Sequence, residues 1–216
     1  MTPPAEFQLP ALFDLGATFA FSLTGALAGI KRGYDIVGVF FLALVCGLGG
    51  GLIRDGVFIH SGLTPILTDP RYIETVVAAI VAGALFGRRV NRFHRLIAIL
   101  DALGLGAYAA FGTQKALHAG LAVPAAILVG VINASGGGLL RDIITRQEPL
   151  VFKPGQFYVL TALGGAVTFV FLLITLELPA TTAGAGAVII TTVFRMLAIA
   201  FNWQTRSVKE YTDVFP

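Results

Sequence analysis

The chain has 216 residues, of which 56% are hydrophobic and only 12% are charged. Because a soluble domain usually carries about a quarter charged residues, this composition excludes an ordinary soluble domain and indicates an integral membrane protein. The formal net charge of +3 comes from basic residues in short segments between apolar runs, which offer no continuous basic face for nucleic acid.

Apolar segments follow one another along the whole chain. A membrane-spanning helix needs about 20 mostly apolar residues, and these runs lack the alternation of apolar and polar residues that a membrane β-barrel requires. We therefore predict an all-α integral membrane fold, organised as one transmembrane domain over residues 1–216. The seven predicted spans are 11–30, 36–60, 72–88, 96–117, 122–146, 155–176 and 181–203.

Basic residues in the connecting segments predict the orientation. With the N-terminus outside, the inner loops and tail hold most of the lysines and arginines, which is the distribution that the positive-inside rule requires. We therefore expect a multi-pass protein of the cell (inner) membrane with a cytoplasmic C-terminus, and hence an odd number of spans. The inner side then holds Lys31, Arg32, Arg88, Arg89, Arg92, Arg95, Arg146, Lys153, Arg206 and Lys209, and the outer side Arg71 and Lys115.

One heptad occurs twice. Residues 49–55 read GGGLIRD and residues 136–142 read GGGLLRD, 87 positions later. The same offset relates Asp14 to Asp101, and an ordered series of such matches indicates an internal duplication.

The two copies are predicted to be inverted. Repeat one covers 11–88 and repeat two covers 96–176, each with three spans, and the helix at 181–203 lies outside the repeat. Because three is odd, the second copy enters the membrane from the opposite side. Inverted repeats with interrupted helices are typical of transport proteins, whose path or binding site lies near the midplane between the halves.

The glycine triplets of the heptads are candidate kinks. Consecutive glycines permit a bend or an unwound turn, and unwound backbone is tolerated in a bilayer where it lines a wet cavity. The alternative role is close helix packing. Asn133 and Ser135 either line the same wet path or bond a neighbouring helix. The six glycines are Gly49, Gly50, Gly51, Gly136, Gly137 and Gly138.

Charged residues within the spans are predicted to pair. At 1.5 Å per residue, Arg54 and Asp14 each lie about 10 Å outward from the middle of their spans, and Arg141 and Asp101 match in depth on the inner side. Asp55 and its counterpart Asp142 are expected to point elsewhere, because residues i and i+1 do not share a helix face. Such pairs either clasp helices together or form a charge ring at each mouth of a water-filled path.

Two further basic residues have less definite predicted roles. Arg195 has no repeat counterpart, and it either snorkels to the inner surface or lines the path. Lys115 lies near an outer interface, where we expect it to snorkel. The sequence has no nucleophile elbow, phosphate-binding loop or metal-ligand spacing, so we expect no enzyme activity, no cofactor and no metal beyond transient potassium ions.

With paired GGGL(I/L)RD heptads in two three-span halves and a seventh span, the chain resembles the TRIC family of trimeric intracellular cation channels. The resemblance implies a homotrimer with an hourglass pore in each protomer, permeation of monovalent cations, chiefly potassium, and contact with membrane lipids. It also implies that the heptad glycines are pore-lining kinks with Arg54 and Arg141 beside them. Bacterial relatives are also labelled as a glycine transporter domain, a name that does not establish a substrate.

The leading interpretation is therefore a potassium-permeable channel. The alternative is a secondary transporter of a small solute such as an amino acid, and a third is a non-conducting scaffold or lipid-binding protein. The sequence favours the channel because neither half concentrates serine, asparagine or aromatic residues around its glycines.

Overall fold

The computed structural model describes residues 9–60, 63–87, 94–153, 157–203 and 205. Within these ranges the chain is helical, without strands. The elements are α1 (Ala11–Arg32), α2 (Ile36–Ile53), the π-helical turn η2 (Arg54–Ile59), α3 (Pro65–Thr68), α4 (Arg71–Gly87), α5 (His94–His118), α6 (Val123–Ile144), α7 (Tyr158–Val170), the π-helical turn η4 (Phe171–Thr175) and α8 (Ala180–Ala200).

Six helices in the described ranges are long and apolar enough to cross a membrane. They lie close to six of the seven predicted spans, the first being Ala11–Arg32 and the last Ala180–Ala200. The remaining prediction, 72–88, corresponds to α4, which has 17 residues and falls short of a typical span. The all-α membrane fold is thus confirmed.

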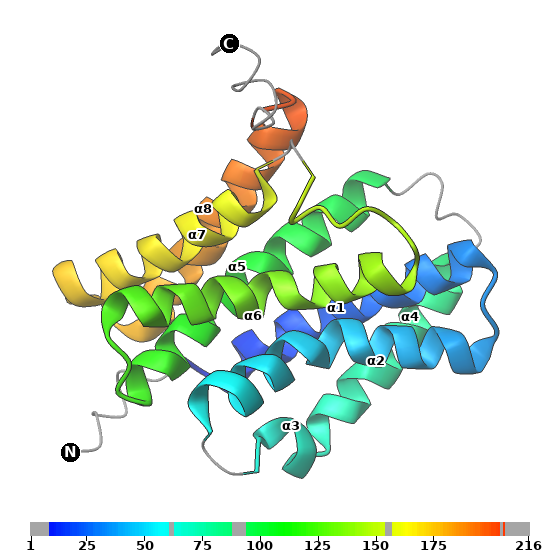
Figure 1. The fold of residues 1–216 in the computed structure, drawn as a ribbon, viewed down its shortest axis with the longest axis horizontal. Helices are drawn as coiled ribbons and strands as arrows, with labels where there is room; N and C mark the ends of the chain where they lie inside the picture. Colours follow the sequence, from blue (N-terminus) through cyan, green and yellow to red (C-terminus); the bar gives the residue numbers. More distant parts are fainter. Residues whose placement is uncertain (1–8, 61–62, 88–93, 154–156, 204, 206–216) are drawn as a thin grey trace, which may run out of the picture.

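Four helices form the centre of the molecule. Helix α1 packs against α2 and α5, and α6 packs against the same two helices, so that α1, α2, α6 and α5 form a ring. The diagonal helices α1 and α6 touch only slightly. Helix α4 covers α1 and α2 on one side of the ring, and α7 and α8 cover α5 and α6 on the other (Figure 1).

Local sequence signals set the ends of the ring helices. Helix α1 ends at Gly33, whose φ of 75° lies in the left-handed region that glycine adopts without strain. Helix α2 starts immediately afterwards, because the Asp35 carboxylate accepts a 2.8 Å hydrogen bond from the Gly38 amide. This short reversal holds α1 and α2 antiparallel.

Candidate functional site

The two glycine triplets lie where α2 crosses α6. A Cβ atom placed on Gly50 would collide with the carbonyl oxygen of Asn133, and one on Gly137 would collide with that of Cys46. These contacts are reciprocal, because Gly50 and Gly137 are 87 positions apart and so are Cys46 and Asn133. The glycines therefore allow the two backbones to touch.

The remaining triplet glycines are also packed against neighbours. The α-helix continues through both triplets, so the expected unwound turn is absent from both helices. Close packing, the alternative role, accounts for the observed contacts, whereas bending of the helix axes at the glycines stays a prediction. A side chain would meet Leu140 at Gly49, Ile66 at Gly51, Gly50 at Gly136 and Tyr158 at Gly138.

A cluster of buried charges surrounds Arg54 at the end of α2. Its Nε lies 2.6 Å from Asp55 Oδ1 and its Nη1 lies 3.5 Å from Asp14 Oδ1 on α1. The guanidinium also stacks over the ring of Phe111 at 5.3 Å. Only 1% of the Arg54 side chain is exposed. The predicted pairing of Arg54 with Asp14 is therefore present.

Three further side chains complete this group. Lys115 Nζ lies 2.7 Å from Asp55 Oδ2. The Thr64 hydroxyl donates a 2.5 Å hydrogen bond to Asp55 Oδ2, and the Tyr72 hydroxyl donates to Asp14. We call this group the Arg54 cluster. Its two cations and two carboxylates balance in charge, as buried ions require.

Two sequence predictions about these charges are wrong. Asp55 and Asp142 do not point away, since each accepts a hydrogen bond from the arginine that precedes it. The i, i+1 rule describes the directions of Cβ atoms, whereas a long arginine side chain reaches across to its neighbour. Lys115 does not snorkel, because Asp55 offers a carboxylate partner within its reach.

A second cluster surrounds Arg141 at the other end of the ring. Arg141 Nη1 lies 3.1 Å from Asp101 Oδ1, as predicted, and its Nε lies 3.1 Å from Asp142 Oδ1. Asp142 Oδ2 also accepts a 3.1 Å hydrogen bond from the Leu150 amide. The side chain of Arg141 is 13% exposed. This Arg141 cluster (Asp101, Arg141 and Asp142) is therefore less enclosed than its counterpart.

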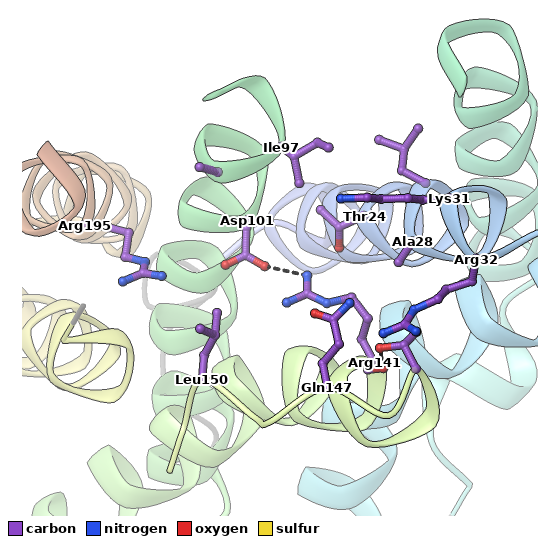
Figure 2. A pocket seen from close by; sticks show the side chains of 13 residues that line it. Thr24, Ala28, Lys31, Arg32, Ile97, Asp101, Arg141, Gln147, Leu150 and Arg195 are labelled. Atoms are coloured by element: carbon purple, nitrogen blue, oxygen red, sulfur yellow. Dashed lines mark hydrogen bonds and ion pairs between the residues drawn. The ribbon is translucent and has the colours of Figure 1, made fainter. Parts of the chain in front are cut away.

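The greater exposure comes from a cavity of about 540 Å³, called here the Arg141 cavity. Arg195 is buried and points into this cavity toward Asp101 (Figure 2). Its guanidinium stacks on Tyr158 at 5.0 Å. Arg195 is therefore buried in the cavity wall and does not reach the surface, while its role in lining a conduction path stays a prediction. The wall consists of Thr24, Leu27, Ala28, Lys31, Arg32, Ile97, Ala98, Asp101, Arg141, Thr145, Gln147, Leu150 and Arg195.

Asn133 and Ser135 lie elsewhere. Asn133 Nδ2 donates a 2.8 Å hydrogen bond to the Tyr108 carbonyl on α5, so it bonds a neighbouring helix. The Ser135 hydroxyl donates to the Val131 carbonyl of its own helix at 2.7 Å. Neither side chain belongs to the described wall of the Arg141 cavity.

Sequence reasoning missed Thr64, Tyr72 and Tyr108. The first two lie in the segment between two predicted spans, at 61–71, or just after it, and no repeat match singles them out. Tyr108 had a usable signal, because it lies 87 positions after Phe21 and both positions are aromatic.

Comparison with known proteins identifies relatives of this chain. A family model described as Glycine transporter matches residues 11–88 and 98–174. A UPF0126 membrane protein of Deinococcus radiodurans is 34% identical over 156 residues, which are 71% of each chain. The inner membrane protein YadS of Escherichia coli is 28% identical over 190 residues, covering 88% of this chain and 91% of YadS.

Solved structures share the fold. The TRIC trimeric intracellular cation channel orthologue from Rhodobacter sphaeroides superposes with a TM-score of 0.81 at 30% identity, covering 88% of this chain and 96% of that chain. A TRIC cation channel solved to explain conductance has a TM-score of 0.79 at 30% identity, covering 93% of this chain and 97% of that one. The structural neighbours of this chain are thus cation channels of the membrane.

Proposed function

This chain belongs to the Glycine transporter family, and we propose that it is a cation channel with a conduction path inside the ring of α1, α2, α6 and α5. The observation that carries the proposal is the pair of charge clusters at opposite ends of this ring. Charges inside a membrane protein are costly and mark ion paths by default. The two TRIC cation channels share the overall fold of this chain, with TM-scores of 0.81 and 0.79, which supports the proposal.

The finer architecture is part of the proposal. Helix α4, whose 17 residues extend about 25 Å, is the third span, which gives seven in all. The two segments matched by the family model, 11–88 and 98–174, run close to the two inverted halves. The reciprocal contacts of Gly50 and Gly137 support a two-fold relation between those halves.

The polarity and assembly are proposed as well. The positive-inside rule places the Arg141 cavity on the cytoplasmic side and the Arg54 cluster outside. Potassium is the expected ion, passing arginines whose charge the neighbouring carboxylates neutralise. A homotrimer in contact with membrane lipids is the expected assembly.

The test is electrical recording from the purified full-length chain in planar bilayers under a potassium gradient. A channel gives unitary current steps that reverse near the potassium equilibrium potential. The proposal is contradicted if the folded, reconstituted protein gives no current steps and instead takes up one solute into liposomes in a saturable way.

That second outcome describes the rival function, a secondary transporter of a small solute such as an amino acid. One observation favours it: among the described residues the Arg141 cavity opens at one end of the ring while Arg54 and Asp14 at the other end are buried, which resembles the one-sided access of an alternating transporter. Uptake of labelled glycine and other small amino acids, measured in the same liposomes as potassium flux, separates the two functions.

A further inference from the structure

Two aromatic side chains meet at the centre of the four-helix ring. The rings of Phe21 on α1 and Tyr108 on α5 are stacked, with centroids 5.5 Å apart and planes 15° apart. Phe21 is 0% exposed and Tyr108 is 1% exposed. The two residues are 87 positions apart, the offset that relates the two heptads. When equivalent positions touch each other, the two-fold axis that relates them passes between them.

The stacked pair contacts all four helices of the ring. A Cβ atom on Gly137 of α6 would lie 3.5 Å from Phe21 Cγ, and one on Gly104 of α5 would lie 3.1 Å from Phe21 Cε2. The Tyr108 hydroxyl donates a hydrogen bond to the Gly47 carbonyl of α2, and it lies 2.8 Å from the Thr18 hydroxyl of α1. The glycines at 47, 104 and 137 thus leave room for the two rings between the four helices.

The pair also lies between the two charge clusters. Along α1, Phe21 follows Asp14 by two turns and precedes Thr24, which lines the Arg141 cavity, by one turn. Along α5, Tyr108 lies about 10 Å from Asp101 and from Lys115 alike. Neither ring belongs to the described wall of the cavity, so the cavity ends before it reaches them.

We propose that the Phe21–Tyr108 stack is the barrier that closes the conduction path at its midpoint, an inference that rests on the channel function proposed above. Two rings packed to the density of a protein interior leave no room for a hydrated ion, and an apolar constriction excludes water. Opening therefore requires the rings to separate. The hydrogen bonds of the Tyr108 hydroxyl to α1 and α2 hold its ring in one position in the closed state.

The experiment compares variants of the full chain in planar bilayers. Phe21→Ala removes one ring, and its open probability is expected to rise about tenfold, equivalent to about 1.4 kcal/mol. Phe21→Leu keeps an apolar side chain and the fold, and a smaller rise is expected. Tyr108→Phe keeps the ring but removes the hydroxyl, so its stack persists and its open probability stays within about threefold of wild type.

The matched control is Phe169→Ala. Phe169 is also 0% exposed but packs in a separate cluster with residues of α8, so its removal creates a comparable cavity outside the ring. If Phe21→Ala and Phe21→Leu behave like Phe169→Ala, the stack is not the barrier. If the wild-type chain itself passes no current, the channel function fails first, and the two failures are thereby distinguished.

Discussion

Arg54 and Arg141 occupy equivalent positions but bind in unlike surroundings. Arg54 is enclosed, and its partner Asp55 also holds Lys115 and Thr64. Arg141 borders a cavity, where water can share in neutralising its charge. Removing a carboxylate should therefore cost more in the Arg54 cluster, because the Arg54 side chain is 1% exposed whereas that of Arg141 is 13% exposed.

Stability measurements can check this difference. Asp55→Asn is expected to lower the free energy of unfolding by about 3–5 kcal/mol, since it leaves the buried Arg54 and the partly buried Lys115 with one carboxylate, that of Asp14. Asp142→Asn is expected to cost about 2 kcal/mol, because Arg141 keeps Asp101 and the cavity. Thermal unfolding of the detergent-solubilised protein measures both, and equal losses contradict the argument.

The same arginines should affect opening. Arg54→Ala leaves Asp14, Asp55 and Lys115 with a net charge of −1 and removes the group that ties α1 to α2. We expect its open probability to rise about tenfold, equivalent to about 1.4 kcal/mol. Arg141→Ala should act in the same direction but less strongly, because Arg195 faces the same cavity.

Arg71→Ala is the control for these recordings. Arg71 pairs with Asp69 at 2.6 Å, but its side chain is 59% exposed, so the pair contributes little. Unchanged conductance and open probability in Arg54→Ala and Arg141→Ala would rule out a gating role for the arginines.

For individual residues, the sequence predicted two ion pairs between different helices but not the pairs between neighbouring residues, Arg54 with Asp55 and Arg141 with Asp142. Depth along the spans matched Arg54 to Asp14 and Arg141 to Asp101, because helix rise is fixed. Depth carries no information about how far a flexible side chain extends. The bond from Lys115 to Asp55 therefore required the packed structure, where helices 60 residues apart in sequence meet.

At the scale of the elements, the backbones of α2 and α6 touch each other, and glycine makes this contact possible. Each triplet places a bare backbone against a carbonyl of the other helix, at Asn133 and at Cys46. Such contacts gain packing energy without side-chain entropy, which is how membrane helices associate when lipid supplies no hydrophobic driving force.

Substitution by alanine tests the crossing. Gly50→Ala or Gly137→Ala would place a methyl group on a backbone carbonyl that cannot move aside, and each should cost about 1–3 kcal/mol. Gly16→Ala is the control, because nothing lies within 4 Å of its Cβ position. It should be neutral or stabilise by up to about 1 kcal/mol, since alanine favours helix. Midpoints of thermal unfolding rank the three variants, and a similar midpoint for all would contradict the close crossing.

The helices themselves were largely predictable, since long apolar runs leave few alternatives in a membrane. The two π-helical turns were not, because a single wide turn leaves no compositional pattern. The short helix α3 was also missed: it lies between two spans, and its four residues are too few for periodicity.

The whole molecule is asymmetric about its midplane. Among the described residues, one end of the ring borders a cavity of about 540 Å³, while the buried pair of Arg54 and Asp14 occupies the other end. The repeat predicted two similar ends. Features without counterparts break that similarity, namely the turn η2, Lys115 and Arg195.

Thiol labelling can detect the asymmetry. The variants are made in a Cys46→Ser background and treated with a maleimide that does not cross the membrane. Ala28 lies on the cavity wall, so Ala28→Cys should react from the cytoplasmic face only. Leu63 is 78% exposed, and Leu63→Cys should react from the opposite face only. Thr18→Cys, at a buried site beside Tyr108, should react slowly from both faces. Right-side-out and inside-out vesicles separate the faces. Reaction of Ala28→Cys and Leu63→Cys from one common face would reject the proposed orientation.

The one-sided cavity also determines where the membrane voltage falls. Water in the cavity carries the potential of one solution inward to Thr24, so the drop is confined to the packed part of the ring between Thr24 and the opposite end, which the Arg54 cluster occupies. The electric field across the Phe21–Tyr108 stack is therefore stronger than that of a uniform drop over the ~30 Å hydrocarbon thickness. A unit charge crossing it exchanges about 2.3 kcal/mol per 100 mV, which couples small movements of the Arg54 cluster to the potential, whereas Lys31 on the cavity wall stays outside the field.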